Sequence, residues 1–141
     1  MIGDMLLAFG ELEYLLCKIA AENSSDSSPV LRALYRISGT TPRYQAADAL
    51  VREIHVKRGD GDAFSEAIGA FRTCMHIRHQ YAHCTWADGG KGRNGGLYFT
   101  DPTVTAKVTE GWDQKWRHVN PRLLREQSAY PYYVKVIIPL P

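Results

Sequence analysis

Arg78, His79 and His83 form a basic, titratable cluster near the end of a long stretch of helical periodicity, in the segment Arg-His-Gln-Tyr-Ala-His at positions 78–83. Arginine carries a permanent charge on a planar fork that matches phosphate oxygens. Histidine is the side chain best suited to exchange a proton near neutral pH. We therefore interpret Arg78, His83 and His79 as candidate catalytic residues that act on an RNA phosphodiester.

The chemistry that this cluster could perform is transesterification of RNA. His83 would take the proton from a ribose 2′-hydroxyl, or donate one to the leaving 5′-oxygen. Arg78 would stabilise the negative charge of the phosphorane-like transition state. His79 would orient the pair or supply a second proton-transfer group. This route requires a 2′-hydroxyl and neither a metal nor a cofactor, so we expect RNA and not DNA to be cleaved.

The spacing of the cluster raises a geometric problem. On an ideal helix His79 and His83 lie on nearly the same face, whereas Arg78 and His83 lie about 140° apart. The long arginine stem, distortion at the helix end or a second copy of the helix would close this gap. Two helices packed around a two-fold axis would place two arginines and two histidines in one cleft. The sequence thus favours a homodimer with a composite site.

The elements that must position the cluster are helical in the first half of the chain. Apolar residues at three- and four-residue steps predict a helix over 2–22. Pro29 suits the first turn of a second helix that ends near Ser38. Thr41 and Pro42 predict the start of a third helix, which ends near Gly59 and turns Ala46, Ala49, Leu50 and Ile54 inward. A fourth helix then runs from about residue 60 to His83.

The second half changes character after a glycine-rich loop over 88–96, whose Lys91 and Arg93 are candidate substrate-binding residues. Residues 97–100 and 104–108 predict two short strands. A last helix starts at Asn120-Pro121, and Pro131 either kinks it or ends it, in which case 132–138 form a strand. We predict one mainly α domain over 1–141. It is an up-and-down helical bundle of about four to five helices, with its core at 1–86 and a small β element in the extension over 97–141.

The composition is that of a globular protein, with 45% hydrophobic and 23% charged residues among 141. A formal charge of +2 does not by itself indicate a nucleic-acid binder. No signal peptide and no apolar run of about 18 residues is visible, so we expect a cytoplasmic protein without a membrane partner. Cys17, Cys74 and Cys84 are then expected to be reduced thiols.

Residues 78–83 resemble the motif of HEPN-domain proteins, an arginine followed by a polar residue and then by a spaced histidine. The preceding helical arrangement also resembles this superfamily, and so does Phe9-Gly10-Glu11-Leu12-Glu13 in the first helix. The resemblance covers roughly residues 1–86. It implies a bundle that dimerises through the motif helices and, in many members, a metal-independent endoribonuclease. It also implies a prokaryotic defence or toxin–antitoxin setting, with an antitoxin or another protein as partner.

Other interpretations of these residues stay open. A catalytically inactive HEPN-like dimer that binds a nucleotide or a protein is the rival function. His76, His79 and His83 share a helical face and form an alternative metal site. The same histidines could simply favour the helix dipole. Glu11 and Glu13 are either solvated or, for one of them, a partner of Arg78. The tryptophans either stack on bases or, as we favour, close the C-terminal layer over the bundle (Trp86, Trp112 and Trp116).

Overall fold

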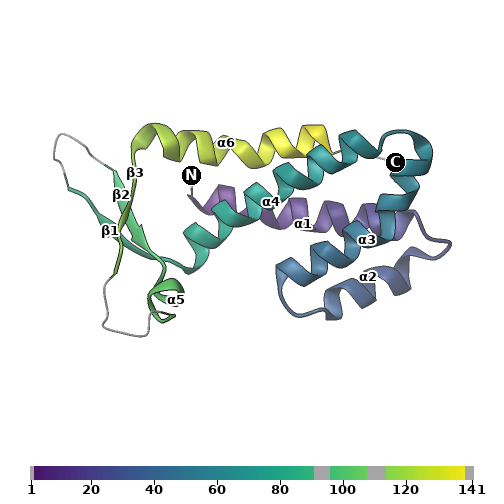
Figure 1. Ribbon diagram of the computed structural model, residues 1–141, viewed down its shortest axis with the longest axis horizontal. Helices are drawn as coiled ribbons and strands as arrows, with labels where there is room; N and C mark the ends of the chain where they lie inside the picture. Colours follow the sequence, from purple (N-terminus) through teal and green to yellow (C-terminus); the bar gives the residue numbers. More distant parts are fainter. Residues whose placement is uncertain (1, 91–95, 108–113, 139–141) are drawn as a thin grey trace.

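The chain forms an elongated helical bundle with a small sheet at one end (Figure 1). The computed structural model describes residues 2–90, 96–107 and 114–138. The predicted mainly α, up-and-down bundle is confirmed, because successive helices alternate in direction and the last one runs back along the first and the fourth. The helices are α1 (Ile2–Glu22), α2 (Ser27–Arg36), α3 (Thr40–Arg58), α4 (Gly61–His83), α5 (Pro102–Thr105) and α6 (Pro121–Ile137).

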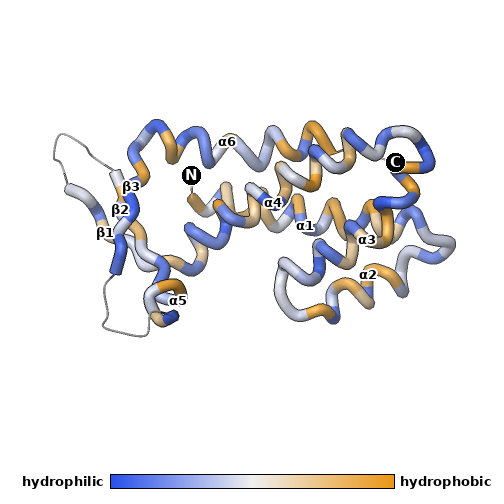
Figure 2. Tube along the Cα trace, in the orientation of Figure 1, coloured by the Kyte–Doolittle hydropathy of each residue, from blue (hydrophilic) through white to orange (hydrophobic). Residues whose placement is uncertain are grey.

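The core lies between α1, α3, α4 and α6, which pack against one another. Phe9 and Leu12 of α1 and Phe64 and Phe71 of α4 are almost completely buried. Burial of a side chain of this size contributes about 1.5–3 kcal/mol. Figure 2 shows that polar residues instead predominate in the C-terminal turns of α4. The core therefore holds one face of α4 as far as Ile77 and Tyr81, and the polar residues of the last turns lie on its other face.

The buried face of α3 differs from the prediction by about one residue. Leu50, predicted to point inward, is 52% exposed, and Ala49 is exposed as well. Tyr44 packs edge-on against Phe71, with ring centroids 5.2 Å apart. Because polar aromatic rings fill the core along this helix, its inner face does not follow the most apolar residues. The buried residues of α3 are Tyr44, Ala47, Asp48, Val51 and His55.

The junction of α3 and α4 is built around His55. Gly59 ends α3 with φ of 85°, a left-handed conformation that glycine adopts without strain. The next residue, Asp60, places its Oδ2 3.0 Å from His55 Nδ1. The His55 ring is stacked on Phe64 with a centroid distance of 4.2 Å. These contacts lock the first turn of α4 onto the end of α3, where a helix break was predicted.

The sheet lies between α4 and α6 in the sequence and at one end of the molecule (Figure 1). Its strands β1 (Thr85–Asp88), β2 (Leu97–Thr100) and β3 (Arg117–Val119) are antiparallel in the order β1-β2-β3. The register pairs Thr85 with Thr100 and Leu97 with Val119. The prediction of a strand at 97–100 is confirmed, and β1 and β3 are strands that the sequence did not indicate.

One prediction for the C-terminal third is wrong, and one of the two alternatives for Pro131, a helix that ends there, is excluded. Residues 104 and 105, expected in a strand, belong to helix α5, which Asp101 begins by accepting a hydrogen bond from the Thr103 amide at 2.9 Å. Helix α6 starts after Asn120 as predicted but continues through Pro131 to Ile137. A proline inside a helix costs about 3 kcal/mol. Burial of Pro131 and Val134 against the bundle offsets that cost.

Candidate functional site

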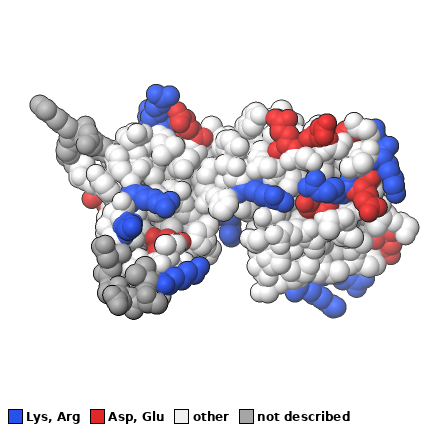
Figure 3. All heavy atoms as spheres, viewed as in Figure 1, with Lys and Arg blue, Asp and Glu red and all other residues white. Residues whose placement is uncertain are grey.

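A pocket of about 430 Å³ lies where the last turns of α4 meet the start of α3. We call it the bundle-side pocket, and Figure 3 shows the surface hollowed between the sheet end and the end formed by α2 and α3. It brings Arg78, His79 and His83 together within a single chain. A second copy is not required for these three side chains to share one pocket. The lining residues are Gly39, Thr40, Thr41, Pro42, Met75, Arg78, His79 and His83.

The wall opposite the α4 residues is the N-terminus of α3. Gly39 precedes the helix, and no side chain caps it there. The first backbone N–H groups of a helix have no partner inside the helix and carry the positive end of its dipole. Such a helix start attracts anions. The start of α3 and Arg78 line the same bundle-side pocket, so two sources of positive potential adjoin the same space.

A buried ion pair holds the start of α3 in place. Arg43 donates a hydrogen bond to Glu13 of α1 and two more to the carbonyls of Leu34 and Ile37, at 3.2 and 3.0 Å. Thr40 Oγ1 also donates to Glu13, at 3.4 Å. The Glu13 and Arg43 side chains are only 12% and 16% exposed. This network ties α1, the end of α2 and the start of α3 together directly behind the pocket.

The two glutamates of α1 have different roles. Glu13, which we expected to be solvated or to orient Arg78, instead pairs with Arg43 and supports the pocket indirectly. Glu11 is exposed and pairs with Lys135 of α6 at 3.1 Å. Neither glutamate pairs with Arg78. The sequence did not distinguish them because both lie in the same short acidic stretch of the helix.

The bundle-side pocket is electrostatically suited to an anion. None of its described lining residues is acidic. Among the residues that the structure describes, none forms an ion pair with Arg78 or with His83. The rings of His79 and His83 lie 5.2 Å apart between centroids. Arg78, which has no ion pair within the described ranges, and two neighbouring histidines thus line the same cavity.

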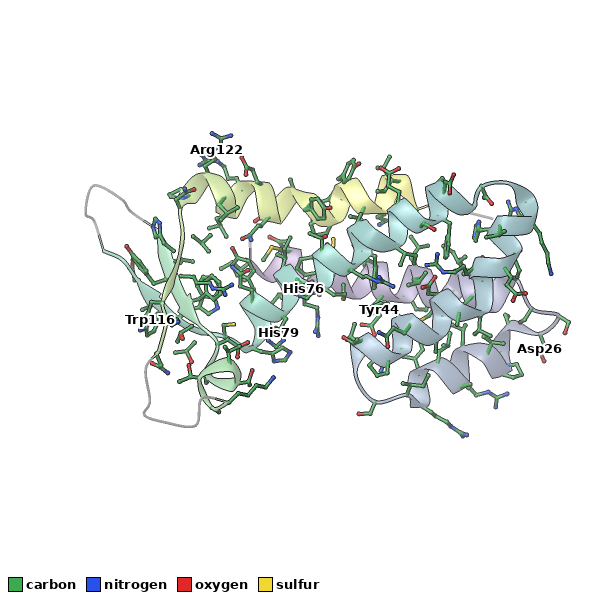
Figure 4. All side chains as sticks on the ribbon, in the orientation of Figure 1. Asp26, Tyr44, His76, His79, Trp116 and Arg122 are labelled. Atoms are coloured by element: carbon green, nitrogen blue, oxygen red, sulfur yellow. The ribbon has the colours of Figure 1, made fainter. Side chains whose placement is uncertain are left out.

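A second pocket, of about 340 Å³, lies on the other side of His79, between α4, β2, α5 and the segment that leads into β3. We call it the sheet-side pocket. His79 contributes to both pockets, and Figure 4 shows its side chain near the end of α4 next to α5. The lining residues are His76, His79, Gln80, Cys84, Phe99, Thr100, Asp101, Val104, Thr105, Lys115 and Arg117.

Asp101 gives the sheet-side pocket an acidic group, which the lining of the bundle-side pocket lacks. Its carboxylate accepts hydrogen bonds from Thr103 and lies 3.2 Å from His79 Nε2. The hydrogen bonds from Thr103 and then from His79 lower the pKa of Asp101 to about 2. Burial and then the charge of Asp101 raise the pKa of the Cys84 thiol. This pocket therefore combines a fixed negative charge, an imidazole and a protonated thiol.

The predicted site residues are divided between these pockets. Arg78, His79 and His83 meet in the bundle-side pocket, whereas His76 lies with His79 in the sheet-side pocket (Figure 4). The three histidines of the alternative metal site are thus not gathered in one pocket. Lys91 and Arg93, the candidate substrate-binding residues, lie outside the described residues.

Of the two tryptophans that the structure describes, Trp86 follows the structural interpretation and the exposed Trp116 does not. Trp86 packs against the core, stacks on Tyr81 at 4.7 Å and contacts Phe99 at 5.1 Å. Its Nε1 donates to the Gln80 carbonyl. It closes the sheet over the bundle. Trp116 is 45% exposed in the sheet region, and Trp112 lies outside the described residues.

Sequence reasoning missed the contribution of α3 and of the C-terminal third. The sequence indicated only a break between helices at Thr40 and a helix start at Thr41, and did not indicate a part of the site. Asp101 carried a signal, because aspartate before proline is a common helix start, but nothing in the sequence placed it beside His79. Both contributions depend on contacts between distant segments.

Comparison with known proteins provides no further guidance. No protein-family model matches the chain, and no curated protein or solved structure matches it significantly. Among the described residues, no helix is both long and apolar enough to cross a membrane. The geometry of the two pockets must therefore carry the functional argument.

Proposed function

We propose that this protein is a metal-independent endoribonuclease that cleaves RNA phosphodiesters at the bundle-side pocket. The observation that carries the proposal is the convergence of Arg78, His79 and His83 with the start of α3 around one cavity without acidic lining. A phosphodiester is an anion, and the groups here are those that bind phosphate oxygens and transfer protons.

The reaction requires no further group. His83 accepts the proton of the ribose 2′-hydroxyl, and the 2′-oxygen attacks phosphorus while the bond to the 5′-oxygen breaks. Arg78 and the first amides of α3 stabilise the charge that gathers on the phosphoryl oxygens. His79, beside His83, protonates the leaving oxygen or orients its neighbour. The products are a 2′,3′-cyclic phosphate and a free 5′-hydroxyl.

Two further features support the proposal. Residues 78–83 resemble the HEPN motif, and the chain is mainly helical, as such proteins are. A homodimer through α4 is part of the proposal, since it would set two such pockets side by side and extend the surface for a longer RNA. A cytoplasmic role in prokaryotic defence, with an antitoxin or another protein partner, is the setting that the resemblance implies.

The test is incubation of the purified chain with labelled single-stranded RNA in EDTA, beside the Arg78→Ala and His83→Ala variants. We expect wild type to give 2′,3′-cyclic-phosphate ends, both variants to lose them, and a 2′-deoxy substrate to stay intact. Arg36→Ala is the matched control, because it removes the same charge from an exposed position of α2.

The contrary outcome is equally informative. If RNA stays intact, or if all variants cleave alike, the catalytic proposal fails. Fluorescence anisotropy with a labelled nucleotide then tests the alternative, a catalytically inactive module. In that case Arg78→Ala should weaken nucleotide binding and Arg36→Ala should not.

A further inference from the structure

The sheet-side pocket contains three different donor groups that converge from separate parts of the chain. A ring nitrogen of His79, the Cys84 sulfur and an Asp101 carboxylate oxygen lie within 4.8 Å of one another. His79 comes from the last turns of α4, Cys84 directly follows that helix, and Asp101 begins α5. A separation of 22 residues between His79 and Asp101 means that the tertiary fold, and not the helical spacing, brings them together.

The distances suit a small divalent cation. Zinc lies about 2.0–2.3 Å from nitrogen, oxygen and sulfur ligands in a tetrahedral site, which places the ligand atoms about 3.3–3.8 Å apart. His79 Nε2 and Asp101 Oδ2 are already 3.2 Å apart. The Cys84 sulfur lies within 4.8 Å of a ring nitrogen of His79 and of a carboxylate oxygen of Asp101, at most about 1 Å beyond the upper end of that range.

The donor types and charges also suit zinc. Imidazole, thiolate and carboxylate are the ligands that this borderline-soft ion accepts. A carboxylate and a thiolate together supply two negative charges, which match those of the ion. A thiol binds a metal ion as the thiolate, so metal binding by the half-buried Cys84 would release its proton.

We propose that His79, Cys84 and Asp101 form a zinc-binding site whose fourth position opens into the sheet-side pocket. The pocket of about 340 Å³ leaves room there for water or an anionic ligand, with Lys115 and Arg117 on its lining. Three protein ligands with a fourth position for water or substrate is the arrangement of zinc sites that keep an open coordination position. The proposed zinc site shares only His79 with the proposed ribonuclease site, whose other groups, Arg78 and His83, lie in the other pocket. Metal binding is measured without RNA, so either proposal can fail while the other stands.

The test is titration of the metal-free full chain with Co²⁺, which reports tetrahedral coordination by its visible absorption and thiolate ligation by a near-ultraviolet charge-transfer band. We expect both signals to saturate at one equivalent and to disappear on addition of Zn²⁺. Cys84→Ser should abolish the charge-transfer band. His79→Gln and Asp101→Asn should weaken binding by at least the roughly 10–100-fold that loss of a supporting partner costs.

The variants are chosen so that a loss of metal binding is not caused by a loss of structure. Asp101→Asn retains an oxygen that can accept a hydrogen bond from Thr103, so α5 keeps its cap, and far-ultraviolet circular dichroism checks the fold. Cys17→Ser is the matched control, because Cys17 is buried within α1 away from the pocket. The proposal is overturned if no tetrahedral spectrum develops, if the charge-transfer band survives Cys84→Ser, or if His83→Gln abolishes binding as completely as His79→Gln.

Discussion

Two histidine–aspartate pairs in this molecule consist of the same chemical groups but differ in burial and in role. In the first, His55 is 1% exposed, stacks on Phe64 and lies 3.0 Å from Asp60, five residues away. In the second, the His79 side chain is 51% exposed and lies 3.2 Å from Asp101, 22 residues away, between two pockets. The comparison teaches that surroundings, not residue type, separate a histidine that holds the fold from one that can meet a ligand.

The largest expected effect comes from His55→Ala. Removal of a buried stacked ring leaves a cavity between α3 and α4, and loss of a large core side chain costs about 3–5 kcal/mol. His79→Ala, at a half-exposed position, should change stability by no more than about 0.5 kcal/mol. Urea unfolding measures both. Equal losses for the two variants would remove the distinction between the pairs.

The two glutamates of α1 extend the same comparison to ion pairs. Glu13→Gln leaves Arg43 without its charge partner in a site that is only 12–16% exposed, so we expect a loss of about 3 kcal/mol. Glu11→Gln breaks an exposed pair with Lys135 and should cost about 1 kcal/mol or less. Because Thr40 also bonds to Glu13, only Glu13→Gln should disturb the start of α3. Urea unfolding of the two variants tests this, and similar losses would contradict it.

The same contrast explains how much the sequence could predict. Helices α1 and α4 follow from local periodicity and helix-start signals, and the cluster of Arg78, His79 and His83 follows from residue types within one helix. The buried role of His55 does not, because it depends on Phe64 in the next helix.

The local sequence pattern also could not predict that the motif would lie between two pockets. Asp101 and Thr40 reach the motif only through packing of α5 and α3 around α4. Residues 104 and 105 were misassigned because their β-branched types favour a strand, whereas the Asp101 cap starts a helix there. The sequence left open whether Pro131 kinks or ends the last helix, because the burial of Pro131 in the bundle is a tertiary effect. Long-range contacts therefore account for the missed pocket residues and for Pro131, whereas competing local signals account for residues 104 and 105.

Acid should destabilise the fold at the His55–Asp60 pair, because Asp60 is protonated there at low pH. The hydrogen bond from His55 lowers the pKa of Asp60 below its ordinary value of 3.8. A lowered pKa stabilises the folded state above the ordinary value, and this contribution is lost as the pH falls through the lowered one. Asp60→Asn does not titrate, so the stability advantage of wild type over this variant should shrink as the pH falls below 3.8. Urea unfolding at several acidic pH values, with Glu53→Gln as an exposed control, measures it; an advantage that grows in acid would contradict it.

The smallest expected effect concerns the exposed pair and rests on both proposals. Zinc bound by His79, Cys84 and Asp101 would engage the one residue that the two pockets share, while Arg78 and His83 stay free. Added Zn²⁺ should therefore slow RNA cleavage only as far as His79→Gln does, by less than the roughly 10²-fold that loss of a proton-transfer group costs. Cys84→Ser should cleave RNA at a rate that zinc does not change. If zinc instead stops cleavage completely in wild type and in Cys84→Ser alike, the ion acts in the bundle-side pocket or on the RNA, and His79 does not link the two pockets.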